Sequence, residues 1–263
     1  MEKRVAVVTG ASRGIGLAMA RRLAADGWQV WGLSRRAGDA DGVEWRGCDV
    51  TDGAAVAAVF SEILAVAGRV DLLVCNAGMG VSGAAEFAAG ADVRRQLDVN
   101  LLGAVACAQQ VIAPMRGQGG GRIVFTSSLG ALFPLPYQSF YSVSKAGLNA
   151  FSDALGLEVR RFGIETCVLL LNDVKTDFTD TRRKDETGDA VYGGRVTAAV
   201  GKMEASERRG MAPERVADAL AALLRRRHLP PHKIVGAGNT VLGLLYRLLP
   251  TAWMLRLLGK LYG

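Results

Sequence analysis

Tyr141 and Lys145 are the pair of residues in this chain whose types and spacing could most clearly do chemistry. Four residues apart on a helix, their side chains would lie on one face as neighbours. A lysine ammonium favours the phenolate form of a nearby tyrosine and lowers its pKa from the usual value of about 10. Such a pair could pass a proton to or from a carbinol or carbonyl oxygen. The same spacing also occurs by chance on solvated helices, so the rest of the sequence has to decide.

The composition fits a single α/β domain without a metal site. The chain has 263 residues, half of them hydrophobic, which is enough for one domain with a large core. Its two histidines and four isolated cysteines (Cys48, Cys75, Cys107 and Cys167) predict neither disulfides nor a zinc site. The apolar run after Arg4 is too short for a secretory signal, and we expect a cytoplasmic protein.

The net charge of +7 comes from the C-terminal end of the chain. All 25 acidic residues lie at or before Asp218, whereas seven of the 32 basic residues follow it. The part of the chain up to Asp218 is therefore balanced in charge. A general nucleic-acid-binding surface is not expected from this distribution.

The N-terminal residues have the pattern of a phosphate-binding unit. Residues 4–8 are a β-branched and alanine run, as in a strand buried on both faces. A glycine-rich turn over residues 9–16, a helix to about Ala25 and a second strand over 29–33 follow. The glycines would let the backbone approach a pyrophosphate at the helix N-terminus.

Strands and helices continue to alternate along the chain. This predicts a parallel sheet with helices on both faces, the doubly wound α/β class with a Rossmann-type arrangement, as one domain over residues 1–263. Ligands of such sheets bind at the carboxyl ends of the strands. The further predicted strands are 43–48, 70–75, 121–126 and 165–171, and the further predicted helices are 53–67, 93–115 and 140–162.

Polar motifs lie at these strand ends and on the helices that follow. They are Asn76-Ala77-Gly78, Asn100 and Ser128. Together with the glycine-rich turn and the Tyr141–Lys145 pair, they make residues 3–177 resemble the short-chain dehydrogenase/reductase family. Ser128 precedes Tyr141 by thirteen positions, which is the family's usual interval.

The resemblance implies a role for each of four residues. Tyr141 would be the general acid/base, and Lys145 would bind the nicotinamide ribose and lower the tyrosine pKa. Ser128 would hydrogen-bond the substrate oxygen and stabilise the charge that develops there. Asn100 would hold a water that links Lys145 to bulk solvent.

The residues after the second predicted strand favour NADP(H) as the cofactor. An NAD-binding protein of this architecture has an acidic residue there for the ribose hydroxyls, whereas this chain has Ser34, Arg35 and Arg36. Guanidinium groups, with Arg13 in the glycine-rich turn as another, suit a 2′-phosphate. The residues expected to bind the cofactor, in part by the resemblance, are Gly10, Ser12, Arg13, Gly14, Ile15, Gly16, Ser34, Arg35, Asp49, Val50, Asn76, Ala77, Gly78, Tyr141, Lys145, Val174 and Thr176.

One motif departs from the family pattern. After the strand at 165–171, the family usually has Pro-Gly before a short run that ends in threonine, and this chain has Leu171 and Asn172 before Thr176. A side chain at Asn172 thus stands where glycine lets the backbone approach the nicotinamide. Asparagine tolerates the left-handed backbone region better than most residues, but the side chain could reshape the pocket floor.

Two features describe the expected substrate site. Residues 178–210 are polar, with little periodicity, and the resemblance implies a mobile lid over the substrate. Large apolar residues near Ser128 and Tyr141 favour an apolar substrate, although ordinary loop packing would also explain them. These residues are Met79, Val81, Leu129, Leu132, Phe133, Leu135, Pro136 and Phe140.

The C-terminal extension over residues 238–263 is not standard for the family. It predicts an apolar, basic helix that Thr251 caps. The helix is too apolar to stay bare, and it could cover the pocket, pair subunits, lie on an anionic membrane or dock an acidic partner protein. Its apolar residues are Leu244, Leu245, Leu248, Leu249, Trp253, Leu255, Leu257, Leu258, Leu261 and Tyr262, and its weakly polar stripe is Ala252, Arg256, Gly259, Lys260 and Gly263.

These observations predict an NADP(H)-dependent oxidoreductase that interconverts an apolar ketone and its secondary alcohol. A hydroxysteroid is the first expected substrate and a 3-oxoacyl thioester the second. A cofactor-binding sensor or scaffold without turnover is the alternative from another class, which the Asn172 departure favours. By resemblance, helices 93–115 and 140–162 would pair subunits in a homodimer or homotetramer.

Overall fold

Seven parallel strands form the central sheet, in the order β3-β2-β1-β4-β6-β7-β9. The computed structural model describes residues 3–262, and the side chains of all of these except residues 237, 242 and 244–247. The predicted roles of Leu244, Leu245 and Gly263 therefore fall outside what is described. The strands are β1 (Val5–Thr9), β2 (Gln29–Ser34), β3 (Val43–Gly47), β4 (Leu72–Cys75), β6 (Gly121–Ser128), β7 (Ile164–Leu171) and β9 (His232–Ile234).

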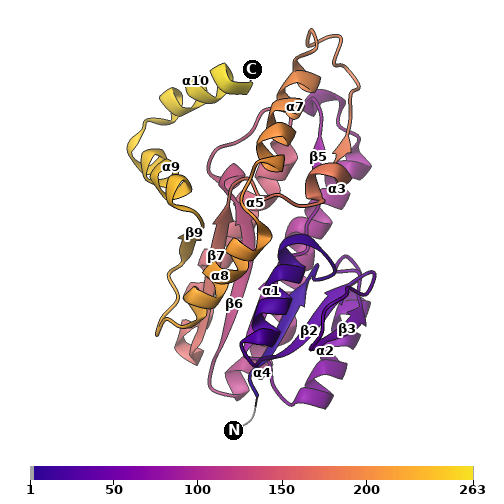
Figure 1. The fold of residues 1–263 in the computed structure, drawn as a ribbon, viewed down its shortest axis with the longest axis vertical. Helices are drawn as coiled ribbons and strands as arrows, with labels where there is room; N and C mark the ends of the chain where they lie inside the picture. The colour runs from indigo at the N-terminus through magenta and orange to yellow at the C-terminus, as the bar shows by residue number, and fades with distance from the viewer. Residues whose placement is uncertain (1–2, 263) are drawn as a thin grey trace.

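Helices cover both faces of this sheet, so the predicted doubly wound α/β class is confirmed (Figure 1). Successive residues of β1 point to opposite faces, and both sets are buried: Val5 and Val7 in one core cluster, Ala6 and Val8 in the other. The first cluster lies under α2 (Gly53–Ala67), α4 (Gly103–Gly117) and α5 (Ser139–Val159), and the second under α1 (Gly14–Ala25) and α8 (Pro213–Leu224).

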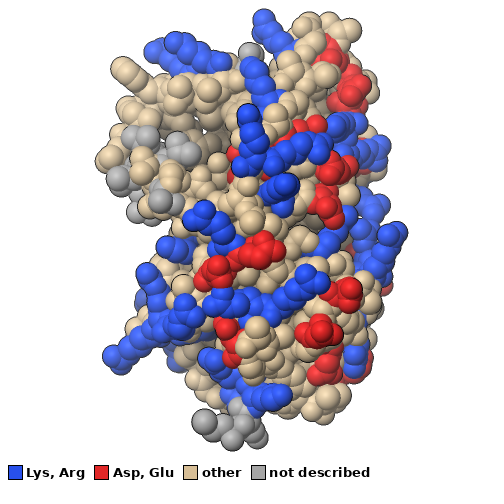
Figure 2. Space-filling view, in the orientation of Figure 1, with Lys and Arg blue, Asp and Glu red and all other residues tan. Residues whose placement is uncertain are grey.

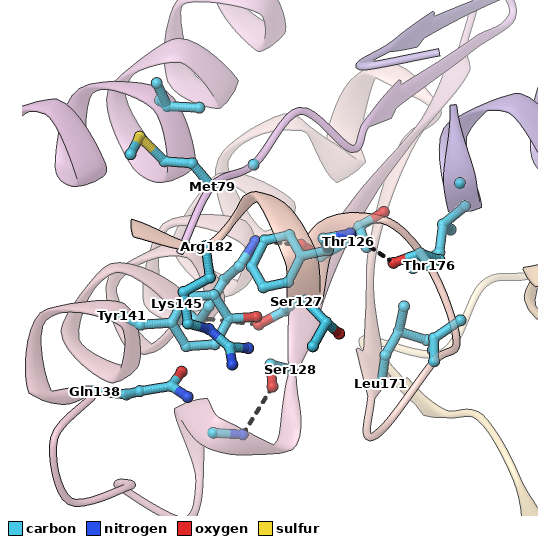
Figure 3. A pocket seen from close by; sticks show the side chains of 18 of the residues that line it. Met79, Thr126, Ser127, Ser128, Gln138, Tyr141, Lys145, Leu171, Thr176 and Arg182 are labelled. Carbon is cyan, nitrogen blue, oxygen red and sulfur yellow. Dashed lines mark hydrogen bonds between the residues drawn. The ribbon is translucent and has the colours of Figure 1, made fainter. Parts of the chain in front are cut away.

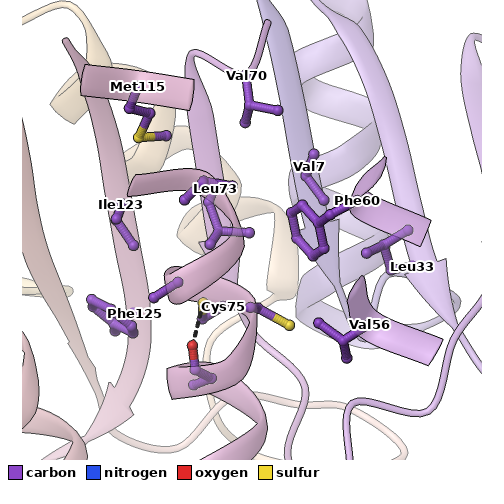
Figure 4. Packing of buried hydrophobic residues seen from close by; sticks show 14 of the residues in the cluster. Val7, Leu33, Val56, Phe60, Val70, Leu73, Cys75, Met115, Ile123 and Phe125 are labelled. Atoms are coloured by element: carbon purple, nitrogen blue, oxygen red, sulfur yellow. Dashed lines mark hydrogen bonds between the residues drawn. The ribbon is translucent and has the colours of Figure 1, made fainter. Parts of the chain in front are cut away.

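In the first core cluster, side chains of α2 and α4 pack against the strands. Figure 4 shows Phe60 and Val56 of α2 against the strands, with Met115 of α4 over β4 and β6. All three side chains are closed to solvent. A strand that is apolar throughout needs helices over both faces of its sheet, and these helices cover one of them.

The direction of strand winding reverses beside β1. Strand β1 pairs with β2 on one side and with β4 on the other. In such a sheet the crevice at the reversal point, outside the carboxyl ends of the strands, is where ligands bind. The segments that follow β1, β4 and β6 therefore define the place where a site is expected.

The helix predicted over residues 93–115 is interrupted. Helix α3 (Gly90–Leu97) passes through a π-helical turn, η2 (Asp98–Leu102), before α4 begins at Gly103. Such turns add a residue to the helical repeat and occur often at functional sites, and Asn100 is buried within this one. By length and composition the whole stretch Gly90–Gly117 could also cross a membrane, yet its Cys107 and Val111 are buried in the domain core.

The region predicted as an irregular lid, residues 178–210, contains regular structure. It comprises α6 (Phe178–Thr181), β8 (Arg183–Lys184) and the 14-residue helix α7 (Arg195–Arg208), and β8 pairs with β5 (Val81–Ser82). The expectation of little periodicity was wrong for α7, because its buried face is narrow and consists of Val196, Ala199, Val200 and Met203 in an otherwise polar helix.

The C-terminal extension forms two helices, α9 (Ala237–Leu248) and α10 (Thr251–Tyr262). Figure 1 shows α9 beside β9 at the edge of the sheet, with α10 reaching toward α7. The Nζ atom of Lys202 on α7 donates to the carbonyl of Leu261 at 3.1 Å, and Met254 and Leu258 are buried. The extension therefore lies at the end of the molecule that carries the lid segments.

Candidate active site

Ser128, Tyr141 and Lys145 line one cavity, as the helix spacing of the last two and the family resemblance of the first implied (Figure 3). Ser128 is the last residue of β6, and the other two lie on α5. The Ser128 hydroxyl is near enough to Tyr141 to favour its phenolate form, and Ser128 Oγ accepts from the backbone N–H of Gly130 at 3.0 Å. The Lys145 Nζ atom lies 5.9 Å from the centre of the tyrosine ring.

The pKa of Tyr141 is raised rather than lowered, contrary to the sequence-based expectation. Burial of the hydroxyl is the main cause, because it disfavours the phenolate, and it outweighs the hydrogen bond from Ser128 and the positive charge of Arg182. Burial also lowers the pKa of Lys145 to about 8. The lysine Nζ donates to the carbonyl of Thr126 at 2.9 Å instead of directly to the phenol.

The side chain of Asn100 hydrogen-bonds the backbone of the loop after β4 and does not line the cavity described below. Its Oδ1 accepts from the N–H of Met79 at 2.8 Å, and its Nδ2 donates to the Met79 carbonyl at 2.9 Å and to Ser144 Oγ at 3.1 Å. These bonds fix Met79 beside α5. The water relay expected for Asn100 stays a prediction.

The glycine-rich turn after β1 has the backbone that a phosphate cradle requires. Gly10 and Gly14 have φ angles of +63° and +54°, which side chains disfavour. A Cβ at Gly10 would lie 2.8 Å from Ala77 Cα, and one at Gly16 would lie 2.6 Å from Asn76 Nδ2. The turn thus packs against the loop after β4 and keeps the backbone at its outer edge free of side chains.

Asn76 holds these two loops together. Its Nδ2 donates to the carbonyls of Thr9 and Gly10 at 3.2 and 3.3 Å. Thr9 Oγ1 in turn accepts from the backbone N–H groups of Asn76 and Ala77 at 3.0 and 3.1 Å. Side chains of Thr9 and Asn76 therefore hold the two loops of the predicted cofactor site together. Gly16 takes part in this packing but does not line the cavity.

One cavity of about 1440 Å³ joins the glycine-rich turn to the three catalytic candidates. It is larger than the 300–1,000 Å³ of a site for one small ligand, as expected for a cofactor and a substrate together. All of the predicted site residues line it except Gly16 and Asn100: Gly10, Ser12, Arg13, Gly14, Ile15, Ser34, Arg35, Asp49, Val50, Asn76, Ala77, Gly78, Ser128, Tyr141, Lys145, Val174 and Thr176.

The end of the cavity beside β2 is suited to a phosphate. Arg35 is exposed there and makes no ion pair among the described residues. The pKa of Asp49 is lowered mainly by hydrogen bonds from Thr51, and the charge of Arg35 lowers it further. Arg13 also lines the cavity, and its Nη2 donates to Thr181 Oγ1 at 3.4 Å. The glycine cradle suits a pyrophosphate, and the exposed Arg35 suits a further phosphate.

Asn172 does not need the backbone freedom of glycine. Tyr137 is the only non-glycine residue with a positive φ in the described part of the chain, so Asn172 is not left-handed. Its exposed side chain lines the cavity, and its Nδ2 is 3.5 Å from Asp173 Oδ2. The departure from the family pattern therefore changes the cavity wall and leaves the backbone unstrained.

Apolar side chains from two distant parts of the chain line the rest of the cavity. Of the predicted wall, Met79, Leu129, Phe133 and Leu135 line it, whereas Val81, Leu132, Pro136 and Phe140 do not. The second set comes from the C-terminal extension: Leu249, Met254, Leu257, Leu258, Leu261 and Tyr262. The extension thus covers the substrate end of the cavity, one of the alternatives that its sequence left open.

Several polar cavity residues could not be found from the sequence. They are Gln138, Arg182, Ser206 and Glu207. Arg182, Ser206 and Glu207 stand in segments with many other polar residues, so residue type and spacing gave no signal. Only the folding of α6 and α7 over the strand ends separates these three residues from the surface charges beside them.

Comparison with known proteins agrees with this geometry. Residues 4–187 match the family model for short chain dehydrogenases. A 3-ketodihydrosphingosine reductase from Bacteroides thetaiotaomicron is 35% identical over 90% of this chain and 89% of its own length. Human 17-beta-hydroxysteroid dehydrogenase type 1 is 34% identical over 68% of this chain and 60% of its own length.

A solved structure supports the same assignment. A short-chain dehydrogenase from Streptomyces avermitilis superimposes with a TM-score of 0.84 and 29% identity, covering 94% of this chain and 93% of that one. The family model spans more than half of the chain and includes the cradle, Ser128, Tyr141 and Lys145. The chain belongs to the short-chain dehydrogenase/reductase family.

Proposed function

We propose that this protein is an NADP(H)-dependent oxidoreductase that interconverts a ketone and a secondary alcohol on a long apolar substrate. The observation that carries the proposal is the single cavity, which runs from the glycine cradle past Tyr141 to the apolar side of α10. A cofactor in the cradle and an alkyl chain against α10 would meet at the catalytic residues. Arg13 and Arg35 favour the phosphorylated form of the cofactor.

The residues around Tyr141 suit reduction. NADPH, when bound, supplies the hydride that adds to the carbonyl carbon. Tyr141 then gives its proton to the oxygen, and Ser128 stabilises the charge that develops on that oxygen. The raised pKa of Tyr141 keeps the phenol protonated at neutral pH, and solvent restores its proton after each turnover.

The extent of the sequence matches favours a long-chain substrate. The ketodihydrosphingosine reductase aligns over 90% of this chain, whereas the hydroxysteroid dehydrogenase aligns over 68%. The cavity continues along α10 past Met254 and Leu258 to Leu261, as an extended alkyl chain would need. A long-chain ketone of the ketodihydrosphingosine kind is therefore our first substrate class.

A hydroxysteroid is the second candidate. The identity to the human 17-beta-hydroxysteroid dehydrogenase favours it, together with the rigid apolar wall of Leu129 and Phe133. A steroid would fill the part of the cavity near Ser128 but would make little use of the side of α10 beyond Leu258.

We also propose that α10 contacts an anionic membrane surface. Its Trp253 is 66% exposed and its Leu255 48% exposed, and Arg256 and Lys260 are its charged residues. Figure 2 shows blue but no red side chains on this helix, which is otherwise tan. Exposed apolar groups flanked by cations favour the interface of an anionic bilayer, from which an apolar substrate could enter.

NADPH oxidation against a set of ketones tests the proposed activity. The set contains a long-chain 3-ketone with a 1-hydroxyl and a 2-amino group, a 17-ketosteroid and a 3-oxoacyl thioester. We expect the long-chain ketone to have the largest kcat/KM, and Tyr141→Phe to lower its kcat by about 10²–10⁴-fold. A control, Tyr192→Phe, removes an exposed lid hydroxyl that bonds Glu86 and should keep activity. NADPH binding without turnover of any ketone would contradict the proposal.

A further inference from the structure

Arg182 places a buried positive charge in the substrate part of the cavity. It follows α6, and its side chain is only 1% exposed. Its Nη2 forms an ion pair with Oε1 of Glu207 on α7. The other carboxylate oxygen of Glu207 accepts from the hydroxyl of Thr179, which is buried, at 2.7 Å. The pair is therefore fixed from two elements and is neutral as a unit.

The guanidinium group has more donors than this pair uses. Its Nε and Nη1 are closed to water and have no hydrogen-bond partner. The Phe178 ring centre lies 5.6 Å from Arg182 Cζ, and Gly80 approaches Nε without a side chain. Leaving buried N–H groups unpaired costs free energy, so an acceptor that comes within hydrogen-bond distance of them when substrate binds would be held favourably.

The unpaired donors lie next to the reacting position. Arg182 and Glu207 line the same cavity as Tyr141, and the charges of both act on the tyrosine. Figure 3 shows the guanidinium beside Tyr141 and Ser128, with Gln138 below them. A group that reaches Arg182 must therefore be attached close to the ketone whose oxygen meets Tyr141.

We propose that Arg182 and Glu207 form a recognition site for a hydroxyl group that the substrate carries two carbons from its ketone. This inference rests on the proposed ketone reduction. A hydroxyl can accept from the guanidinium and donate to the carboxylate at once, which matches the neutral pair. A carbonyl would use only the first interaction, and an alkyl or steroid carbon neither. The substrate class is thus a 1-hydroxy-3-ketone with a long alkyl chain along α10.

Two matched ligand pairs test this site. The first pair is a long-chain 1-hydroxy-3-ketone and the 3-ketone of the same chain without the hydroxyl, compared by kcat/KM with NADPH. The second is the corresponding 1,3-diol and 3-alcohol, compared by calorimetric Kd in the presence of NADP⁺. We expect at least about a 10-fold preference for the hydroxylated ligand in each pair, since a hydrogen bond to a charged group is lost without it.

The variant that isolates the site is the double substitution Arg182→Met with Glu207→Gln. It removes both charges together, so no unpaired buried charge remains to unfold the protein. We expect the preference for the hydroxylated ligand to fall to about 1 in both measurements. Arg208→Met is the control, because Arg208 is half exposed on the same helix and pairs with Asp180 outside the cavity.

The two measurements separate this inference from the proposed function. Reduction of both ketones with equal kcat/KM and equal Kd for the diol and the alcohol would overturn the recognition site and leave the activity standing. A preferred diol without turnover of either ketone would support the site and overturn the activity. A preference that survives the double substitution would assign hydroxyl recognition to other residues and overturn the inference.

Discussion

The two ends of the cavity are built by different means. At the cofactor end, the backbone forms the cavity wall: Gly10 and Gly14 adopt positive φ angles, and Asn76 hydrogen-bonds the glycine-rich turn to the loop after β4. At the substrate end, side chains from α6, α7 and α10 converge from far apart in the sequence. The first end follows the family pattern within residues 4–187, and the second extends beyond it.

This difference teaches where specificity resides. A backbone cradle accepts one kind of group, a pyrophosphate, and tolerates little variation in sequence. A wall of side chains on short helices can change its ligand by substitution without disturbing the sheet. We therefore expect substitutions at the first end to change which cofactor is used and substitutions at the second to change which substrate or surface is bound.

Arg35→Asp is the strongest test at the cofactor end. We expect the ratio of kcat/KM for NADPH to that for NADH to fall about 100-fold or more, because a charge-assisted bond to the 2′-phosphate becomes a repulsion. Steady-state kinetics with each cofactor measure the ratio. Arg160→Asp makes the same charge change away from the cavity and should leave it unchanged. An unchanged ratio in Arg35→Asp would remove this residue from the cofactor site.

At the substrate end, Trp253→Ser with Leu255→Ser tests the membrane contact. Neither residue lines the cavity, so binding can be lost without loss of activity on a dispersed substrate. We expect partitioning onto phosphatidylglycerol-containing vesicles to fall about 10- to 100-fold, since burying a large apolar side chain contributes roughly 1.5–3 kcal/mol. Co-sedimentation measures it, with exposed Val66→Ser on α2 as control. Failure of the unaltered protein to sediment with these vesicles would exclude the contact.

Where the two ends meet, Lys145 gives a pH dependence. Its pKa is about 8 in the folded protein, against an ordinary value of 10.5. The charged form therefore destabilises the fold below pH 8, and this cost disappears as the pH rises toward the unfolded value. We expect Lys145→Met to be more stable at pH 7, by at most about 3 kcal/mol, and its advantage to shrink by pH 10.

Urea unfolding at the two pH values measures this change. The lost hydrogen bond to the Thr126 carbonyl acts at both pH values and so does not alter the sign of the trend. Lys202→Met removes an exposed lysine and should show no trend. A difference between Lys145→Met and the unaltered protein that is equal at pH 7 and pH 10 would argue against the lowered lysine pKa.

Asn172→Gly should have the smallest effect. Because Asn172 is not left-handed, glycine offers no relief of backbone strain. We expect kcat/KM for NADPH to change by less than about 3-fold, within the range of an exposed substitution of about 0.5 kcal/mol. A large gain in activity would mean that the side chain obstructs the nicotinamide site, which would favour the sensor interpretation of the sequence.

The sequence predicted the sheet and the cofactor end because their signals are local. Buried parallel strands require continuous apolar runs, which recur along the chain, and the cradle requires glycines at fixed spacing, which residues 9–16 supply. The meeting of Ser128 with Tyr141 followed from the family interval. Gly16 and Asn100 were also singled out, but they brace the loops rather than line the cavity.

The substrate end could not be predicted, because its contacts depend on how short helices fold over the strands. Arg182 and Glu207 are 25 residues apart among many other charged residues, and nothing in their spacing marks them as a pair. The direction of the Tyr141 pKa shift was missed for a similar reason, since the burial that raises it depends on tertiary structure.

The most direct test of the central claim follows the hydride itself. NADPH is prepared with deuterium at C4 of the nicotinamide, in one form on one face of the ring and in a second form on the other. Each form is incubated with the protein and a long-chain 1-hydroxy-3-ketone. Mass spectrometry of the alcohol should find deuterium on the new carbinol carbon with one of the two forms and none with Tyr141→Phe. Alcohol without deuterium from either form, or no alcohol at all, would contradict a ketone reductase with its reaction centre at Tyr141.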